Sequence, residues 1–194
     1  MNEKYEESFD SSAELVTEPA SCEKYRPALE YTFFQELIDN LPYALMTLLG
    51  STVIIIGLKS SWWGWGLAIL YAMYSITGVF WIILFLCPYC HLFNTRSCPC
   101  GYGRLAARWR APKDSRLFRE KYKKHIPVIV PLWFIPPLTG GIMLIKSFSW
   151  LLFLLLIIFI LDAFMILPLF ARKYGCAHCP QKDACPWMEG KDTI

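Results

Sequence analysis

The sequence has few histidines, and few charged residues lie inside its hydrophobic segments. Only three of the 194 residues are histidines, and none falls within an apolar run, which excludes a haem held by two histidines inside a membrane. Charged residues make up 18% of the chain and are concentrated in a few stretches. A soluble core would not separate charged from apolar residues in this way, so the composition predicts an integral membrane protein.

Neither a signal peptide nor a nucleic-acid-binding module is recognisable. The N-terminus is acidic, without a short apolar core or a small-residue cleavage site, so we expect the first apolar segment to stay in the mature protein. The stretch 94–125 has ten Lys and Arg against two acidic residues, but it falls between two apolar runs. We therefore expect it to contact lipid headgroups or an acidic soluble partner, and we expect no nucleic-acid partner.

Four apolar runs predict four transmembrane helices in two hairpins. The first run, 41–58, is uncharged and just spans a hydrocarbon core of roughly 30 Å at about 1.5 Å per residue. The second run ends at Leu86, the third covers 126–145 and the fourth covers 148–170. Prolines and glycines predict a kinked or broken third helix. Short amphipathic helices are expected over 29–39, ending before a proline, and within the basic loop, which makes the fold class all-α.

Composition divides the chain into three regions. Residues 1–28 form an acidic tail, which we expect to be disordered because it has few aliphatic residues to bury. Residues 29–175 form the four-span domain, including a cysteine-rich and basic loop at 87–125, and residues 176–194 form a cysteine-rich C-terminal tail. Because Lys and Arg in short loops favour the cytoplasmic side, we expect both termini and all of the cysteine-rich segments to face the cytoplasm.

Seven of the eight cysteines lie just beyond the second and fourth apolar runs. The first cluster has the spacing C-x2-C-x7-C-x-C and the second C-x2-C-x5-C. A C-x-x-C turn directs two thiolates at one centre, so this pattern predicts metal binding, and a reducing cytoplasm disfavours structural disulfides. The predicted ligands are Cys87, Cys90, Cys98, Cys100, Cys176, Cys179 and Cys185, with His91 or His178 as an additional candidate.

The sequence leaves the metal open between an iron–sulfur cluster and zinc. Four of these cysteines precede a proline, as in bacterial ferredoxin motifs, which favours iron–sulfur. The spacing nevertheless differs from the ferredoxin run, and zinc sites accept irregular spacing. The first cluster contains enough thiolates to complete a site alone, whereas the second needs a fourth ligand.

Cys87-Pro-Tyr-Cys90 also suggests thiol chemistry. The four residues are identical to the active-site tetrapeptide of glutaredoxins, and this resemblance implies Cys87 and Cys90 as a catalytic pair for thiol–disulfide exchange. A four-span protein with C-x-x-C at a helix end is also similar in architecture to quinone-coupled thiol oxidases and vitamin K epoxide reductases. With His91 the motif satisfies the c-type haem pattern, but such haem is attached outside the cytoplasm and would leave the nearby cysteines unexplained.

Asp162 is the only ionisable residue in the interior of an apolar run. Burying a carboxylate there costs several kcal/mol unless it is paired, protonated or hydrated. We expect it either to relay protons or contact a quinone, or to form a hydrogen bond with a hydroxyl of the second run. The candidate hydroxyls are those of Tyr71, Tyr74, Ser75 and Thr77.

These patterns predict a membrane-bound electron-transfer protein. A cysteine-ligated iron–sulfur centre at the cytoplasmic face would exchange electrons between a soluble redox partner and a membrane carrier such as a quinone, because both can reach the headgroup level. The alternatives are a zinc-stabilised membrane anchor or scaffold and a membrane thiol–disulfide oxidoreductase that uses Cys87 and Cys90.

Overall fold

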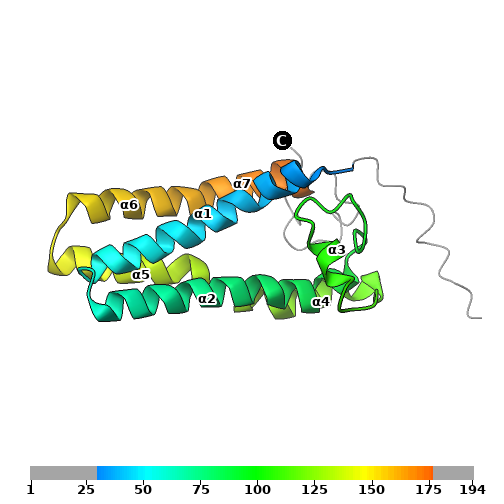
Figure 1. The fold of residues 1–194 in the computed structure, drawn as a ribbon, viewed down its shortest axis with the longest axis horizontal. Helices are drawn as coiled ribbons and strands as arrows, with labels where there is room; N and C mark the ends of the chain where they lie inside the picture. The colour runs from blue at the N-terminus through cyan, green and yellow to red at the C-terminus, as the bar shows by residue number, and fades with distance from the viewer. Residues whose placement is uncertain (1–29, 177–194) are drawn as a thin grey trace, which may run out of the picture.

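The computed structural model describes residues 30–176, which form an all-helical bundle without strands in that range. Four helical segments are long and apolar enough to cross a membrane, and they run as two antiparallel hairpins (Figure 1), as predicted. The first hairpin pairs α1 (Phe33–Gly57) with α2 (Trp62–Phe85), and the second pairs α5 (Pro131–Lys146) with α6 (Trp150–Leu161).

Helix α1 is the centre of the bundle, crossing it obliquely and contacting α2, α5 and α6 (Figure 1). Its buried residues Met46, Gly50, Val53 and Gly57 recur every three or four positions, which places them on one helical face. A Cβ atom at Gly50 would lie only 2.7 Å from the ring of Tyr71. Glycine at this position therefore lets α1 and α2 approach closely.

The separate lead-in helix predicted over 29–39 is wrong, because α1 runs unbroken from Phe33 through Pro42. The helix begins at a capping box in which the Thr32 hydroxyl accepts from the backbone N–H of Gln35. Proline has no backbone N–H, so Pro42 cannot donate to the carbonyl of Ile38. The Pro42 ring is nevertheless buried inside the bundle, and the helix continues past it.

The break predicted in the third span lies before α5 rather than at its internal prolines. The chain forms a 3₁₀ turn at Ile126–Val128, and α5 then continues through Pro136 and Pro137. Because proline has no N–H, Pro136 frees the carbonyl of Leu132, and the Tyr71 hydroxyl donates to that oxygen at 3.0 Å. A residue of α2 thus satisfies a backbone group freed in α5.

The fourth span is continuous but changes its helical pitch. After α6, residues Asp162–Ile166 form a π-helical turn, α7 covers Leu167–Phe170, and a second π-helical turn covers Ala171–Cys176. Isolated π turns often mark functional positions in helices. Asp162 is the first residue of one of them.

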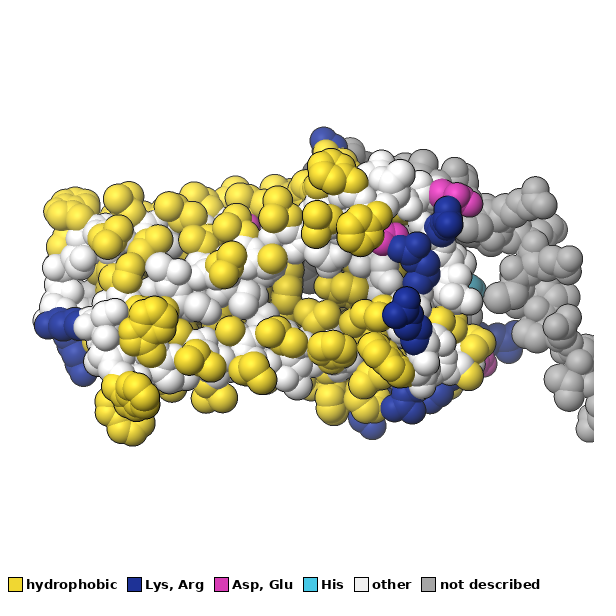
Figure 2. Space-filling model, viewed as in Figure 1, with side chains coloured by type: hydrophobic (Ala, Val, Ile, Leu, Met, Phe, Trp, Pro, Cys, Tyr) yellow, Lys and Arg dark blue, Asp and Glu magenta, His cyan; other side chains and the backbone are white. Residues whose placement is uncertain are grey.

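The loop between α2 and α5 folds over one end of the bundle as a cap, defined as residues 86–125 (Figure 1). It contains the 3₁₀ turns Cys87–Tyr89 and Ser115–Leu117 and the helices α3 (Tyr102–Ala106) and α4 (Phe118–His125). Figure 2 shows Lys and Arg side chains gathered at this end, beside a bundle surface that is largely hydrophobic. The Asp114 side chain caps the second 3₁₀ turn by accepting from the backbone N–H of Arg116.

The opposite end of the bundle consists of two short turns, 58–61 and 147–149. Lys59 and Ser60 both adopt positive φ angles, 52° and 54°, to close the first turn. Trp62 and Trp63 begin α2 beside this turn and are largely exposed. Indole rings at this level suit the membrane–water interface.

Candidate metal centre

The first cysteine cluster lies in the cap, at the end of the bundle where α2 finishes. Cys87 and Cys90 bracket the first 3₁₀ turn, while Cys98 and Cys100 precede α3. All four are partly buried thiols rather than disulfides. Cys87 is close enough to interact electrostatically with Cys98, Cys90 and Cys100, so the fold brings the four predicted ligands into one neighbourhood.

Cys98 sits in a setting that disfavours a free thiolate but offers it hydrogen-bond donors. Burial raises the pKa of the Cys98 thiol above its ordinary value of 9.0, while backbone N–H groups of residues 100–103 act in the opposite direction. The Gly103 N–H donates to the Cys98 sulfur at 3.5 Å. Backbone donors directed at a buried sulfur are typical of cysteines that ligate metal clusters, where they also tune the reduction potential.

Two glycines make this arrangement possible. Gly101 has a φ angle of 70°, a conformation that side-chain-bearing residues rarely adopt. At Gly103 a Cβ atom would lie 2.7 Å from the carbonyl oxygen of Leu92. The glycines in Cys-Gly-Tyr-Gly therefore allow the backbone to turn its N–H groups toward Cys98.

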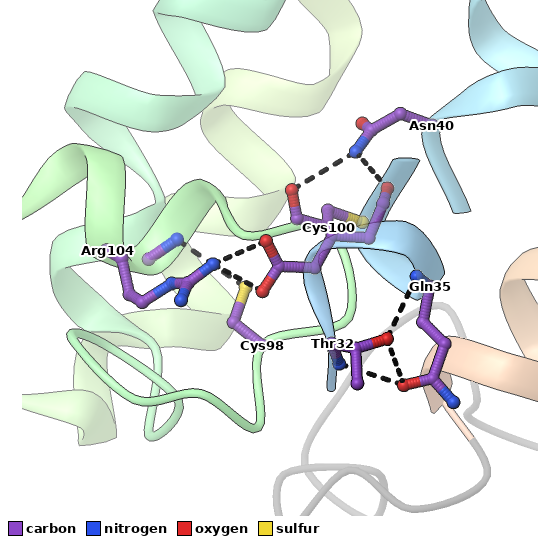
Figure 3. A network of polar contacts seen from close by, with 8 residues as sticks. Thr32, Gln35, Asn40, Cys98, Cys100 and Arg104 are labelled. Carbon is purple, nitrogen blue, oxygen red and sulfur yellow. Dashed lines mark hydrogen bonds and ion pairs between the residues drawn. The ribbon is translucent and has the colours of Figure 1, made fainter. Parts of the chain in front are cut away.

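The cap is fastened to the beginning of α1 by polar contacts (Figure 3). The guanidinium of Arg104 forms an ion pair with Glu36, whose exposure is only 7%. The Asn40 side chain donates to the carbonyl oxygen of Cys100 at 3.2 Å and to that of Glu36 at 2.7 Å. Charged and amide side chains of α1 thus hold the segment that carries Cys100.

Tyr31 links the cap to the end of the fourth span. Its N–H donates to the carbonyl of Arg96 at 2.9 Å, and its hydroxyl donates to the carbonyl of Tyr174 at 2.8 Å. Cys176, the first cysteine of the second cluster, is the last described residue and follows Tyr174 closely in the chain. Its backbone is therefore at the same end of the bundle as the first cluster.

The other predicted ligands lie in the turn after Cys90 and in the C-terminal tail. Cys179, Cys185 and His178 lie outside the described residues, and His91 is exposed in the turn after Cys90. Between residues 30 and 176 no three His, Cys, Asp or Glu side chains converge in a metal-binding arrangement. A metal on the first cluster would require the cap to close around it, with or without ligands from the C-terminal tail.

A cavity of about 180 Å³ adjoins the cysteine cluster. Cys100 and Tyr102 form its wall on the side of the cap, and Asp39, Asn40 and Tyr43 contribute polar atoms from α1. One Asp39 carboxyl oxygen, Oδ2, is buried without a hydrogen-bond partner among the described residues. Burial raises the pKa of the Tyr102 hydroxyl, which keeps it protonated as a hydrogen-bond donor near neutral pH. The remaining lining residues are Pro42, Gly78, Val79, Ile82, Ile129, Leu167, Phe170 and Ala171.

Asp162 is 1% exposed, and both of its carboxyl oxygens lack hydrogen-bond partners within the described part of the chain. It is not among the residues that line the cavity beside Cys100. The hydrogen bonds predicted for it are wrong, because the four candidate hydroxyls of α2 bond elsewhere. Tyr71 donates to Leu132, Tyr74 to Val128 and Thr77 to Met73, while Ser75 bonds with Thr47 and Tyr43.

Sequence reasoning did not identify Glu36, Asp39 or Arg104 as site residues. It placed both carboxylates on the polar face of an interfacial helix, and acidic residues near a helix N-terminus are commonplace. One feature of the sequence could have identified them, because the two carboxylates precede the first span and therefore lie on the same membrane face as the basic loop. Charge complementarity across that face favours contact between them.

No protein-family model matches the chain, and no curated protein or solved structure is significantly similar to it. The arguments for function therefore come from the site.

Proposed function

We propose that this protein carries electrons at a membrane surface through an iron–sulfur centre held by cysteines of the cap, and exchanges them with a quinone. The observation that carries the proposal is the position of Cys100. This residue belongs to the cysteine cluster and also lines the cavity between the cap and the helices. A centre ligated there would adjoin a space open to a small membrane-soluble molecule.

The surroundings of Cys98 support a role as a metal ligand over a role as a free reactive thiol. Thiolates are the ligands of iron–sulfur clusters and of structural zinc. The raised pKa of Cys98 makes it a poor nucleophile at neutral pH, whereas a metal would supply the positive charge that lets the buried sulfur lose its proton. The N–H donors around Cys98 are then already directed at the anionic sulfur.

The cavity has the features that a quinone ring needs. Its lining is mainly apolar, which suits the ring, and Tyr102 can donate a hydrogen bond to a carbonyl oxygen. Reduction of a quinone to a quinol consumes electrons and protons in equal number. The Asp39 carboxyl group, whose buried Oδ2 has no hydrogen-bond partner among the described residues, would pass the protons, while the electrons would come singly from the centre. We therefore assign the quinone contact first to Asp39 and Tyr102 rather than to Asp162.

The distribution of cations supports a cytoplasmic cap. The cap contains ten Lys and Arg residues, and Figure 2 shows Lys and Arg side chains gathered at that end, whereas Lys59 and Lys146 lie in or beside the turns of the other end. The positive-inside rule therefore favours a cytoplasmic cap, where a soluble redox partner would meet it.

A zinc clamp is the second candidate. The contacts of Arg104 with Glu36 and of Tyr31 with Arg96 and Tyr174 show that the cap joins segments from several spans. A zinc ion on the cysteines would reinforce that junction without redox chemistry, as expected of an anchor or scaffold. The exchange of disulfides by Cys87 and Cys90 remains a third prediction, which requires protein without metal.

Metal and acid-labile sulfide analysis of the full chain, purified without oxygen in detergent, separates these functions. Iron with matching sulfide and a broad visible absorption supports the proposal. Stoichiometric zinc without iron overturns it in favour of the clamp, and metal-free protein overturns it in favour of thiol chemistry.

Two variants then distinguish the role of the metal centre from the role of the cavity. Cys98→Ser should lose the metal together with any quinone reduction, because it removes a ligand. Asp39→Asn should keep the metal and lose most of the quinone reduction, because it keeps the shape but removes the proton-transfer group. Equal reduction rates for the wild type and Asp39→Asn would contradict the assignment of the cavity.

A further inference from the structure

A second cavity, of about 190 Å³, lies where the end of α2 meets the basic part of the cap. This volume exceeds the roughly 30 Å³ that one water occupies in the liquid, so the space can hold a polyatomic ion. Among its described lining residues there are four basic side chains and no carboxylate. The lining consists of Leu84, Phe85, Tyr89, Arg110, Lys113, Lys121 and His125.

Two aromatic rings hold these basic groups in place. The Nζ atoms of Lys113 and Lys121 lie 5.3 and 5.8 Å from the centroid of the Tyr89 ring. The guanidinium carbon of Arg110 lies 5.7 Å from the centroid of Phe85, and the His125 ring stacks on Phe85 at 5.4 Å. Cation–π contacts of this kind orient basic side chains without neutralising them.

Within the described part of the chain, the positive charge in the cavity is only weakly compensated. The Glu120 carboxylate approaches Lys121 at 3.7 Å, but Glu120 is 68% exposed and does not line the cavity. An exposed pair of this kind contributes little. Arg110, Lys113 and Lys121 therefore repel one another across the cavity, and a bound anion would convert that repulsion into attraction.

We propose that this cavity binds a phosphate group, and that the phosphate belongs to an anionic phospholipid. Arg and Lys together are the usual partners of phosphate oxygens. The cavity lies at the end of a membrane span, and Leu84 and Phe85 give it an apolar side at the level where glycerol and acyl chains begin. Basic pockets at this level are suited to anionic headgroups. The lining of this cavity includes no cysteine, and the proposal goes beyond electron transfer.

The test is a titration of the full chain in a zwitterionic detergent with phosphatidylglycerol, phosphatidylcholine or inorganic phosphate, read out as the midpoint of thermal unfolding. A ligand that binds only the folded protein raises the midpoint as its concentration rises. Phosphatidylglycerol should raise it and phosphatidylcholine should not. If inorganic phosphate alone gives the same rise, the site takes phosphate from solution, and the phospholipid part of the proposal is overturned.

Matched variants show whether the cavity is responsible. Lys121→Gln and Arg110→Gln should each weaken the apparent affinity about fivefold, the effect of one cation near a headgroup, and Lys121→Arg should restore it. Lys124→Gln removes the same charge from the same helix but lies outside the cavity, so its effect should be clearly smaller. Equal losses in Lys121→Gln and Lys124→Gln, or no preference for phosphatidylglycerol, would overturn the proposal. Folding of each variant is checked by circular dichroism without added lipid.

Discussion

Arg104 binds Glu36 across 68 positions of sequence, with one guanidinium nitrogen contacting both carboxylate oxygens. Glu36 is almost completely buried, whereas the side chain of Arg104 is 38% exposed. This ion pair connects the first turn of α1 to α3 and so fixes the cap over the bundle. The position of Cys98 and Cys100 relative to the first span depends on it.

Replacement of Glu36 by Gln should loosen the cap. The change leaves the guanidinium of Arg104 without its anionic partner, and we expect a loss of roughly 1.5–3 kcal/mol of stability, the range for hydrogen bonds to charged groups. Chemical unfolding in detergent measures the change. Glu120→Gln is the control, because its exposed contact with Lys121 should contribute less than about 1 kcal/mol. Equal effects of the two changes would show that the Glu36 pair does not hold the cap.

Replacement of Gly50 by Ala should destabilise the junction of α1 and α2. The new methyl group would meet the Tyr71 ring at 2.7 Å, and such overpacking typically costs about 1–3 kcal/mol. Gly66→Ala in α2 is the matched control, because nothing lies within 4 Å of its Cβ position and alanine favours a helix by roughly 0.5–1 kcal/mol. The midpoint of thermal unfolding should fall for the first variant and rise slightly for the second. Any rise for Gly50→Ala would show that the helices do not pack this closely.

The metal-free and metal-bound proteins should respond to pH in opposite directions. Without metal, the folded state raises the pKa of Cys98 above its ordinary value of 9.0. Its contribution is present below that pH and is lost as the pH rises through the folded pKa, because the unfolded thiol ionises more easily. With metal bound, the ligand is already a thiolate, so acid rather than alkali should weaken the protein as protons compete with the metal.

Unfolding curves between pH 5 and pH 10, with and without a chelator, measure this difference. Cys98→Ser is the comparison, because it should lose the part of the alkaline sensitivity that comes from Cys98. Burial also raises the pKa values of Tyr31 and Tyr102, so their part of the alkaline sensitivity should remain. Identical alkaline curves for the metal-free wild type and Cys98→Ser would contradict the burial of this thiol.

Replacement of Asp162 by Leu should stabilise the bundle. Both carboxyl oxygens are buried without partners in the described residues, and a polar group left unsatisfied costs about 1–3 kcal/mol. Asp162→Asn keeps a polar group and should gain less. If Asp162→Leu instead lowers the midpoint of thermal unfolding, the carboxyl group has a stabilising partner. A stabilised variant with reduced quinone turnover would identify a functional carboxylate retained at a cost in stability.

The sequence predicted the spans well because hydrophobic length depends only on composition. It predicted the helix boundaries less well around proline. Pro42 and Pro136 both lie inside helices, and at Pro136 a neighbouring helix compensates, because the Tyr71 hydroxyl donates to the Leu132 carbonyl. The sequence cannot show such compensation, since the two residues are 61 positions apart.

For the candidate site, the location of the first cysteine cluster could be predicted from the sequence, but the contacts around it could not. The positions of Cys87 to Cys100 beyond a span follow from hydropathy, and the structure confirms them at one end of the bundle. The pairing of Glu36 with Arg104 and the unpartnered Asp39 oxygen depend on how α1 packs against the cap. The hydrogen-bond partners predicted for Asp162 are wrong because helical spacing alone cannot reveal that the hydroxyls of α2 bond to other groups.

The two short turns have a consequence for how the chain enters a membrane. With the cap on the cytoplasmic side as proposed, the described residues that need to cross the bilayer completely are those near 58–61 and 147–149, each at the tip of a helical hairpin. Each tip includes or adjoins one lysine, Lys59 or Lys146. Each hairpin can therefore insert as one unit during synthesis, with little polar material to translocate. The first hairpin contains α1, so the surface on which the second must assemble is in place before the second is made.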